Sequence, residues 1–329
     1  MKIAVLDDYL HLSQKSADWS KLPADCEVTG FDRPLEVPDE AAEALQPFDV
    51  ISLIRERMPV PRALIERLPN LKLIAITGMY HRTLDVAAAT ARGIVVSHTL
   101  MRGTANKSTY ELAWGLIFSV ARHIPFEANA MKSGGWQHTV GFTLNGRTLG
   151  LVGLGRQGRN MVPVAKALGM NVIAWSPNLT DAIAGEFGVA RVDKDELFRR
   201  SDVVSLHMVL ADSTRNIVAA RELALMKPTA ILVNTSRGPL VEEAALIAAL
   251  RERRIAGAGI DVYHREPLPD DDALRSLPNA VLTPHLGYAT EEFFRIAYED
   301  TVDNIAAFAA GAPIRVLTAE RNDSRLVRI

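Results

Sequence analysis

The sequence is poor in cysteine, in aromatic residues and in net charge. Its 329 residues include one cysteine, Cys26, 6% aromatic residues and a formal net charge of -2. A single cysteine cannot form an intramolecular disulfide, which excludes a disulfide-stapled secreted scaffold and favours a reducing, cytoplasmic environment. The near-neutral charge gives no electrostatic reason to expect nucleic acid or an anionic membrane as a partner. Small molecules, or further copies of the chain, are the expected partners.

Long apolar runs and metal-ligand spacings are also missing. The longest apolar stretch, 112–121, contains Ser119 and is about half as long as the roughly 20 residues that a membrane-spanning helix needs. None of the eight histidines stands at a metal-ligand spacing from Cys26 or from another histidine. We therefore expect neither a membrane segment nor a metal site.

Short β-branched segments alternate with segments of helical period along the whole chain, which is typical of parallel sheets covered by helices on both faces. A chain of 329 residues is longer than one hydrophobic core usually supports, so two domains with a cleft between them are expected. The first series of expected strands is 2–6, 27–31, 50–54, 71–76 and 94–97. The second series is 149–152, 171–175, 203–206, 230–234, 257–262 and 280–283.

The sequence thus predicts an α/β protein with two doubly wound parallel-sheet domains. One is flavodoxin-like and consists of residues 1–100 and 290–329, and the other is a Rossmann dinucleotide-binding domain of residues 101–289. The helix expected at 108–122 is apolar on nearly every side after Glu111, so it must be covered all round. Either the same subunit or a second copy covers it, and a homodimer is the expected assembly. A last helix, 293–310, is expected to return to the first domain.

A glycine-rich loop follows the expected strand 149–152 directly and opens a helix. Its sequence is Gly153-Leu154-Gly155-Arg156-Gln157-Gly158, a GxGxxG pattern. In such loops the first glycine permits a tight turn, the second lets the backbone approach a pyrophosphate, and the third lets the helix pack closely on the strand. In this context of strand, loop and helix, the pattern predicts a dinucleotide site at the positive end of the helix. Pro163 should kink that helix or lie past its first turns.

The residues after the next strand leave the phosphate preference of the cofactor open. An acidic residue is expected there to hold the adenosine ribose, but Trp175 is followed by Ser176-Pro177-Asn178. Without a carboxylate nothing repels a 2'-phosphate, and without a nearby arginine nothing specifically binds one. NAD is the expected cofactor, and NADP stays open.

Three polar segments end the later strands, where ligands bind in open α/β sheets. They are 234–239, with sequence NTSRGP, 261–267, with sequence DVYHREP, and 283–287, with sequence TPHLG. With these segments the chain resembles, over essentially its whole length, the D-isomer-specific 2-hydroxyacid dehydrogenases, the family of phosphoglycerate, hydroxypyruvate and D-lactate dehydrogenases. The resemblance implies hydride transfer between NAD(P)(H) and the C2 carbon of a small D-2-hydroxy or 2-keto acid.

The resemblance assigns catalytic roles to three residues. Arg237 matches the arginine that grips the substrate carboxylate and carbonyl, Glu266 the carboxylate paired with the histidine, and His285 the acid/base. The chemistry agrees, because reduction of a ketone leaves an alkoxide that must take a proton, which histidine can supply. A carboxylate favours the imidazolium, and a guanidinium binds a 2-keto acid at two points.

The resemblance also suggests binding residues. Asp261 matches the acidic residue that holds the nicotinamide carboxamide, although it could simply cap its strand. Further candidates for the cofactor are Arg156, Gln157, Ser176, Thr109, Thr235, Ser236 and His207, the last read as mainly structural. Candidates for the substrate are the loop residues Gly78, Met79 and Tyr80, through their backbone N–H groups, and Arg55 and Arg57, which match positions used for an acidic tail. A solvated surface pair is the alternative for the two arginines.

Two other functions are compatible with parts of this pattern. Transcriptional corepressors that sense nucleotides share the fold and even the three catalytic residues, but no basic patch or partner-binding tail favours this alternative. Formate enzymes of the same superfamily carry glutamine in place of the carboxylate partner, whereas this chain has Glu266. Four bulky or charged residues near the expected pocket depart from the family pattern and leave the substrate open: Lys107, Tyr110, Tyr80 and His81.

Overall fold

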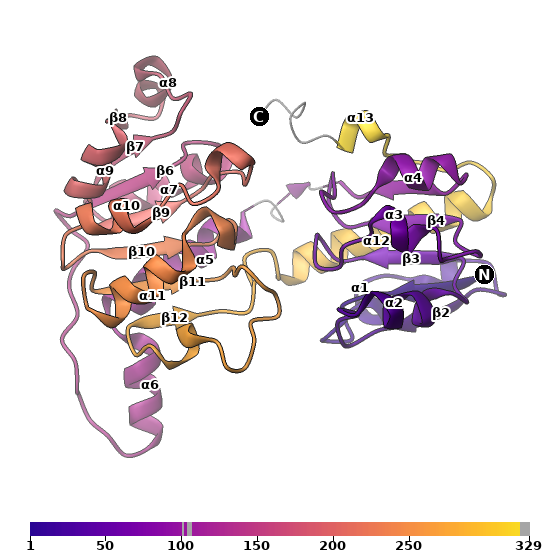
Figure 1. The fold of residues 1–329 in the computed structure, drawn as a ribbon, viewed down its shortest axis with the longest axis horizontal. Helices are drawn as coiled ribbons and strands as arrows, with labels where there is room; N and C mark the ends of the chain where they lie inside the picture. The colour runs from indigo at the N-terminus through magenta and orange to yellow at the C-terminus, as the bar shows by residue number, and fades with distance from the viewer. Residues whose placement is uncertain (101, 104–106, 323–329) are drawn as a thin grey trace. The chain divides into compact units, whose positions relative to one another are not determined.

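The computed structural model describes residues 1–100, 102–103 and 107–322. The chain divides into two compact units (Figure 1). Unit 1 consists of residues 1–106 and 289–329, and unit 2 consists of residues 107–288. Each unit is an α/β structure with its own parallel sheet, as the sequence predicts. No helix within the described part of the chain is long and apolar enough to cross a membrane.

Unit 1 is built on a five-stranded parallel sheet in the order β2-β1-β3-β4-β5, the flavodoxin-like order. Its strands are β1 (Lys2–Val5), β2 (Glu27–Gly30), β3 (Val50–Leu53), β4 (Leu73–Ile76) and β5 (Val95–His98). Its α-helices are α1 (Ser13–Ser16), α2 (Pro38–Leu45), α3 (Arg62–Ile65), α4 (Val86–Ala91), α12 (Glu291–Ala309) and α13 (Ala319–Asn322). The five strands predicted from the sequence are all present, each within two residues of its expected ends.

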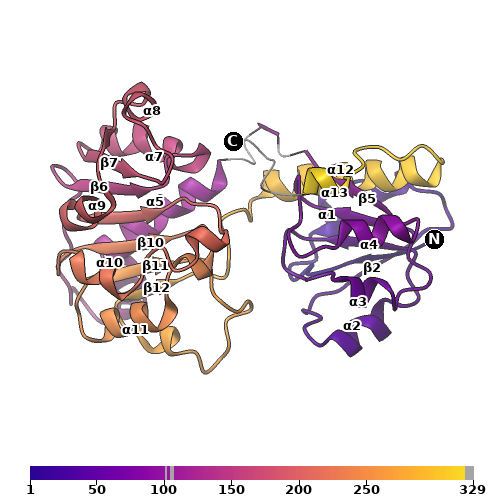
Figure 2. The same cartoon turned by 45° about the horizontal axis from the view of Figure 1, so that its top comes forward.

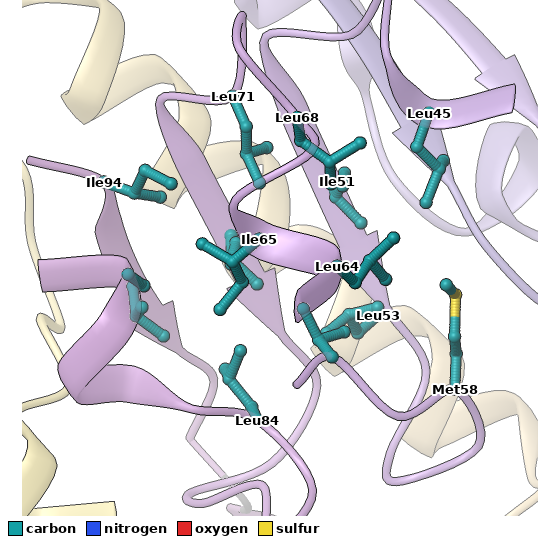
Figure 3. Close-up of a cluster of buried hydrophobic side chains, with 14 of the residues drawn as sticks. Leu45, Ile51, Leu53, Met58, Leu64, Ile65, Leu68, Leu71, Leu84 and Ile94 are labelled. Carbon is teal, nitrogen blue, oxygen red and sulfur yellow. The ribbon is translucent and has the colours of Figure 1, made fainter. Parts of the chain in front are cut away.

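Apolar side chains of the strands and of α2, α3 and α4 form the core on one face of this sheet. Figure 3 shows Leu64 and Ile65 of α3 beside Ile51 and Leu53 of β3. The long helix α12 packs on β4 and α1 within the same unit (Figure 2). These contacts bury the sheet and leave the loops at the carboxyl ends of its strands to carry polar side chains.

Unit 2 contains a seven-stranded parallel sheet in the order β12-β11-β10-β9-β6-β7-β8. Its strands are β6 (Thr148–Val152), β7 (Asn171–Trp175), β8 (Ala190–Arg191), β9 (Val203–Leu206), β10 (Ile231–Asn234), β11 (Gly257–Ile260) and β12 (Ala280–Leu282). Its α-helices are α5 (Ser108–Ala121), α6 (Ile124–Lys132), α7 (Arg156–Ala167), α8 (Asp181–Glu186), α9 (Lys194–Arg200), α10 (Ala220–Leu225) and α11 (Glu243–Arg251). The order outward from β6 is that of a Rossmann sheet, as predicted, but the sheet has seven strands where the sequence analysis expected six.

The sequence raises two questions about helices of unit 2: what covers the apolar helix α5, and where Pro163 lies in α7. Helix α5 packs on β10 and β11, and its apolar residues, such as Ala113 and Ile117, are fully buried in the same unit. A Cβ atom at Gly259 of β11 would lie 2.9 Å from the Cβ of Leu116, so this glycine lets the helix approach the sheet closely. Pro163 lies past the first turns of α7, which continues to Ala167.

Candidate active site

The glycine loop between β6 and α7 has the shape that a pyrophosphate needs. Gly153 has a φ of +102°, and a Cβ there would lie 2.7 Å from the carbonyl oxygen of His207. A Cβ at Gly158 would lie 2.1 Å from the carbonyl oxygen of Gly153, so only glycine fits at these two positions. A Cβ at Gly155, in contrast, would meet nothing within 4 Å. Gly155 is the N-cap residue of α7, so this open position lies at the positive end of the helix, which suits a phosphate group.

Buried polar atoms beside this loop also fit a bound dinucleotide. His207 follows β9, and its Nε2 lies 2.9 Å from the hydroxyl of Ser205. Burial lowers the pKa of His207 to about 4, which keeps the ring neutral. Its Nδ1 and the hydroxyl of Thr235, which follows the neighbouring strand β10, are buried without a hydrogen-bond partner among the residues that the structure describes. A ligand at this edge could satisfy both atoms.

The three predicted catalytic residues follow three adjacent strands. Arg237 comes after β10, Glu266 after β11 and His285 after β12. Nδ1 of His285 lies 2.5 Å from Oε2 of Glu266, and Oε1 of Glu266 accepts a hydrogen bond from the backbone N–H of Tyr263 at 2.9 Å. Burial would raise the pKa of Glu266, but the hydrogen bond and charge of His285 outweigh it and hold the pKa below its usual range. The structure therefore brings together an ionised carboxylate and a histidine ring.

A short hydrogen-bonded turn orients Arg237. The side-chain amide of Asn234 donates to the carbonyl oxygen of Arg237 at 2.9 Å and accepts from the N–H of Ser236 at 3.0 Å. The hydroxyl of Ser236 donates to the carbonyl of Leu206 at 2.7 Å, which ties the turn to β9. Asn234 is 1% exposed. Its positioning role was not predicted, because an asparagine at a strand end is a common turn residue and its partners lie in the folded loop.

Asp261 holds the loop that carries His285. Its Oδ1 accepts hydrogen bonds from the hydroxyl of Thr283 at 2.6 Å and from the N–H of Leu286 at 2.7 Å, and its Oδ2 accepts from the N–H of Gly287 at 2.9 Å. The hydroxyl of Thr109 adds a hydrogen bond of 2.8 Å to the carbonyl of Gly287. Burial raises the pKa of Asp261, and these hydrogen bonds oppose the rise. Asp261 thus binds the loop after the neighbouring strand β12, and its contact with nicotinamide stays a prediction.

In unit 1, the predicted carboxylate loop follows β4. Gly78 has a φ of +118°, and a Cβ there would lie 2.7 Å from Nη1 of Arg55, so glycine lets the guanidinium lie against the loop. The N–H of Gly78 donates to the hydroxyl of Thr99 at 2.7 Å and is therefore already engaged. The N–H groups of Met79 and Tyr80 donate to no group in the described part of the chain. Of the three backbone N–H groups predicted to bind the substrate carboxylate, those of Met79 and Tyr80 are thus the two that can still donate to it.

The next residue of the loop is fixed by the last described helix. The N–H of His81 donates to Oδ1 of Asn322 at 2.8 Å, and Nδ2 of Asn322 donates to the carbonyl of His81 at 2.9 Å. His81 is 0% exposed, and burial lowers its pKa to about 4. Asn322 could not be predicted as a partner from the sequence, because it is 241 positions away from the loop that it holds.

Arg55 and Arg57, the two arginines predicted to bind an acidic tail of the substrate, are not a freely solvated pair. Both follow β3 and are half-buried. The backbone N–H of Arg55 donates to the hydroxyl of Thr77 at 2.8 Å, and the guanidinium carbon of Arg57 lies 4.8 Å from the ring centre of Tyr9.

The comparison with known proteins decides the family. The model of the NAD binding domain of the D-isomer specific 2-hydroxyacid dehydrogenases matches residues 114–287, more than half of the chain. The chain belongs to this family. Glycerate dehydrogenase of Methylorubrum extorquens is 37% identical to this chain over 292 residues, which are 86% of this chain and 89% of that protein.

Two further relatives agree with this assignment. D-3-phosphoglycerate dehydrogenase of Methanocaldococcus jannaschii is 40% identical over 77% of this chain, and the match covers 48% of that protein, so this chain spans about half of its length. The crystal structure of a phosphoglycerate oxidoreductase from Vibrio cholerae o395 superposes with a TM-score of 0.89 at 36% identity, over 95% of this chain and 100% of that one. This family member is an oxidoreductase with an NAD-binding domain, and the corepressor alternative finds no support among these relatives.

Proposed function

We propose that this chain transfers a hydride between NAD(P)(H) and the C2 carbon of a small D-2-hydroxy or 2-keto acid, with His285, Glu266 and Arg237 as the catalytic residues. The observation that carries the proposal is the 2.5 Å contact between His285 and Glu266, at the same sheet edge as the loop of Arg237. The names of the relatives, glycerate and phosphoglycerate enzymes, support a small hydroxylated acid.

The glycine loop holds the dinucleotide in this proposal. Gly153, Gly155 and Gly158 leave room for the pyrophosphate, and the N-terminus of α7, with Arg156 and Gln157, faces it. The remaining proposed cofactor residues are Ser176, His207, Thr235, Ser236, Asp261 and Thr109. When bound, the nicotinamide supplies or accepts the hydride. Ser176 and Asn178 after β7 are neutral, so NAD is proposed with NADP as an alternative.

In this proposal, side chains of unit 2 transfer the proton of the substrate hydroxyl and stabilise the charge that develops on its oxygen. In reduction, hydride reaches C2 and His285 gives its proton to the carbonyl oxygen, so that the ketone becomes a hydroxyl. In oxidation, His285 takes the hydroxyl proton as the hydride leaves C2. Glu266 stabilises the imidazolium in both directions. Arg237 binds the carboxylate and polarises the carbonyl where negative charge develops.

The loop after β4 is proposed to bind the substrate carboxylate through the N–H groups of Met79 and Tyr80, with the guanidinium of Arg55 beside Gly78. Backbone N–H groups and one cation suit a single carboxylate. Arg57, which follows the same strand as Arg55, is proposed as a further residue of the substrate site.

We also propose that the chain forms a homodimer through unit 2. Helix α6 and the segment after it project from the rest of this unit (Figure 1). They carry exposed apolar side chains: Ile124 is 49% exposed, Phe126 52%, Met131 51%, Trp136 77% and Val140 90%. Such a cluster on one projecting element is typical of a protein interface. Light scattering should give a mass of twice 36.0 kDa, whereas a mass of 36.0 kDa would show a monomer and refute the proposal.

The reaction is tested by following reduced-nicotinamide absorbance. The purified protein is mixed with NADH or NADPH and with glyoxylate, hydroxypyruvate, pyruvate or phenylpyruvate. We expect the wild type to reduce at least one of these acids. We expect His285→Ala to reduce none of them while its affinity for the cofactor is unchanged. Tight cofactor binding without reduction of any of these acids would count against the proposed function.

A further inference from the structure

A second group of polar side chains lies at the carboxyl edge of the sheet of unit 1. Asp7 and Tyr9 follow β1, and Arg57 follows β3, its neighbour in the sheet. The chain leaves β1 toward β2 on one side and returns as β3 on the other side. The carboxyl ends of β1 and β3 therefore form the switch point of the sheet, where open α/β sheets bind ligands.

One of the two carboxylate oxygens of Asp7 has no hydrogen-bond partner among the described residues. Asp7 is 8% exposed, and its Oδ1 accepts a hydrogen bond from the hydroxyl of Tyr9 at 2.8 Å. Oδ2 is buried and accepts no hydrogen bond from the residues that the structure describes. The next residue, Asp8, differs, because both of its oxygens accept hydrogen bonds from Ser13. A buried acceptor without a donor is costly, and a ligand that donates a hydrogen bond to Oδ2 would remove this cost.

The charges of the group select the kind of donor. The guanidinium of Arg57 lies over the ring of Tyr9, and its charge acts on Asp7. Burial raises the pKa of Asp7, while the hydrogen bond from Tyr9 and the charge of Arg57 oppose the rise. Since the charges of Asp7 and Arg57 offset each other, the group has no excess charge to attract an anionic or cationic tail. An uncharged hydroxyl is the donor that fits.

We propose that Asp7 is a specificity-determining residue whose Oδ2 accepts a hydrogen bond from a hydroxyl on C3 or C4 of the 2-keto acid. The inference rests on the proposed function and names its substrate class, 2-keto acids with a hydroxylated tail. Strands lie about 4.8 Å apart, so β1 and β4, two strands apart, end about 10 Å from each other. A hydrogen bond at each end takes up about 6 Å. The remaining distance of about 4 Å suits a carboxylate and a hydroxyl on one short carbon chain.

The test compares two acids of equal length, hydroxypyruvate and pyruvate, which differ in the C3 hydroxyl. The variant is Asp7→Gly, because Asp7 has a φ of +56°, which glycine adopts freely. The wild type should prefer hydroxypyruvate in kcat/KM by at least about 10-fold. Asp7→Gly should lower kcat/KM for hydroxypyruvate by about 10- to 100-fold and change that for pyruvate by less than about 3-fold. Asp7→Asn, which keeps one acceptor oxygen, should recover part of the loss.

A matched control is Asp32→Gly, since Asp32 follows β2 at the same edge and its side chain is 63% exposed. It should leave both acids unaffected. Equal losses of both acids in Asp7→Gly, or no loss, would overturn the assignment, as would a wild-type preference for oxaloacetate over hydroxypyruvate. A far-UV circular dichroism spectrum and an unfolding transition like those of the wild type show that both units of each variant are folded. A wild type that reduces no acid with either cofactor refutes the proposed function itself, and the inference with it.

Discussion

Replacing Glu266 by glutamine should slow the two directions of the reaction unequally. The substitution keeps the size of the side chain and removes the charge that lies 2.5 Å from Nδ1 of His285. A hydrogen bond between charged groups contributes about 1.5–3 kcal/mol. In oxidation the imidazolium forms during the reaction, so its full stabilisation is lost from the transition state, and kcat should fall about 10- to 150-fold.

Reduction starts from the imidazolium, so the loss there depends on pH. The charge of Glu266 favours the protonated ring before the reaction begins, and the variant lacks this help. Lowering the pH protonates the ring without the carboxylate. The deficit of Glu266→Gln in reduction should therefore shrink toward acid pH, whereas the deficit in oxidation should persist wherever oxidation can be measured.

The assay is kcat in both directions between about pH 5.5 and 9, with one acid and its 2-hydroxy counterpart. Glu252→Gln serves as control, because the side chain of Glu252 is 53% exposed and pairs only with Arg254 among the described residues. Equal, pH-independent losses in both directions would mean that Glu266 merely shapes the loop. Such a result would refute the argument from charge.

Three further predictions concern other parts of the molecule. Arg237→Lys should lower kcat/KM by at least about 100-fold in the same absorbance assay, because an ammonium cannot bind at two points, and an unaltered kcat/KM would exclude this role. Gly158→Ala should weaken NADH binding at least about 10-fold by fluorescence titration, since its Cβ would lie 2.1 Å from the carbonyl oxygen of Gly153, and wild-type affinity would show that the loop tolerates the methyl group. The buried His81, with its pKa lowered to about 4, protonates more readily in the unfolded chain, so its contribution to stability is lost as the pH falls from about 6.5 to 4. In urea unfolding, His81→Leu should lose about 3 kcal/mol less stability over this pH range than the wild type, and an equal loss in both proteins would contradict the assignment.

Strand positions could be predicted because buried parallel strands are nearly continuous runs of apolar residues. All 11 expected strands are present, and the missed one, β8, has two residues, too few to show any pattern. Positions of the catalytic residues relative to the strands were predictable for the same reason, since polar segments directly follow β10, β11 and β12. The strands fix which edge these side chains share, and the family resemblance suggests what they do there.

The hydrogen bonds that position these residues could not be predicted. The hydroxyl of Thr99 accepts the hydrogen bond of the Gly78 N–H, and Asn322, which is 241 positions from His81, accepts that of the His81 N–H. These partners are ordinary polar residues whose role depends on long-range packing, which leaves no local signal. The orphaned oxygen of Asp7 is of the same kind, because the sequence shows two adjacent aspartates and cannot tell which one its neighbours satisfy.

The separate hydrophobic cores of the two units have a consequence for changes in substrate range. The strand-end residues proposed to recognise the acid lie on unit 1, whose core comes from its own strands and helices, whereas His285, Glu266 and Arg237 lie on unit 2. A substitution at Asp7 or Tyr9 therefore leaves the packing around the proton-transfer groups unaltered. Selection, natural or in the laboratory, can diversify the accepted acids through the first hundred residues while the hydride chemistry is inherited unchanged.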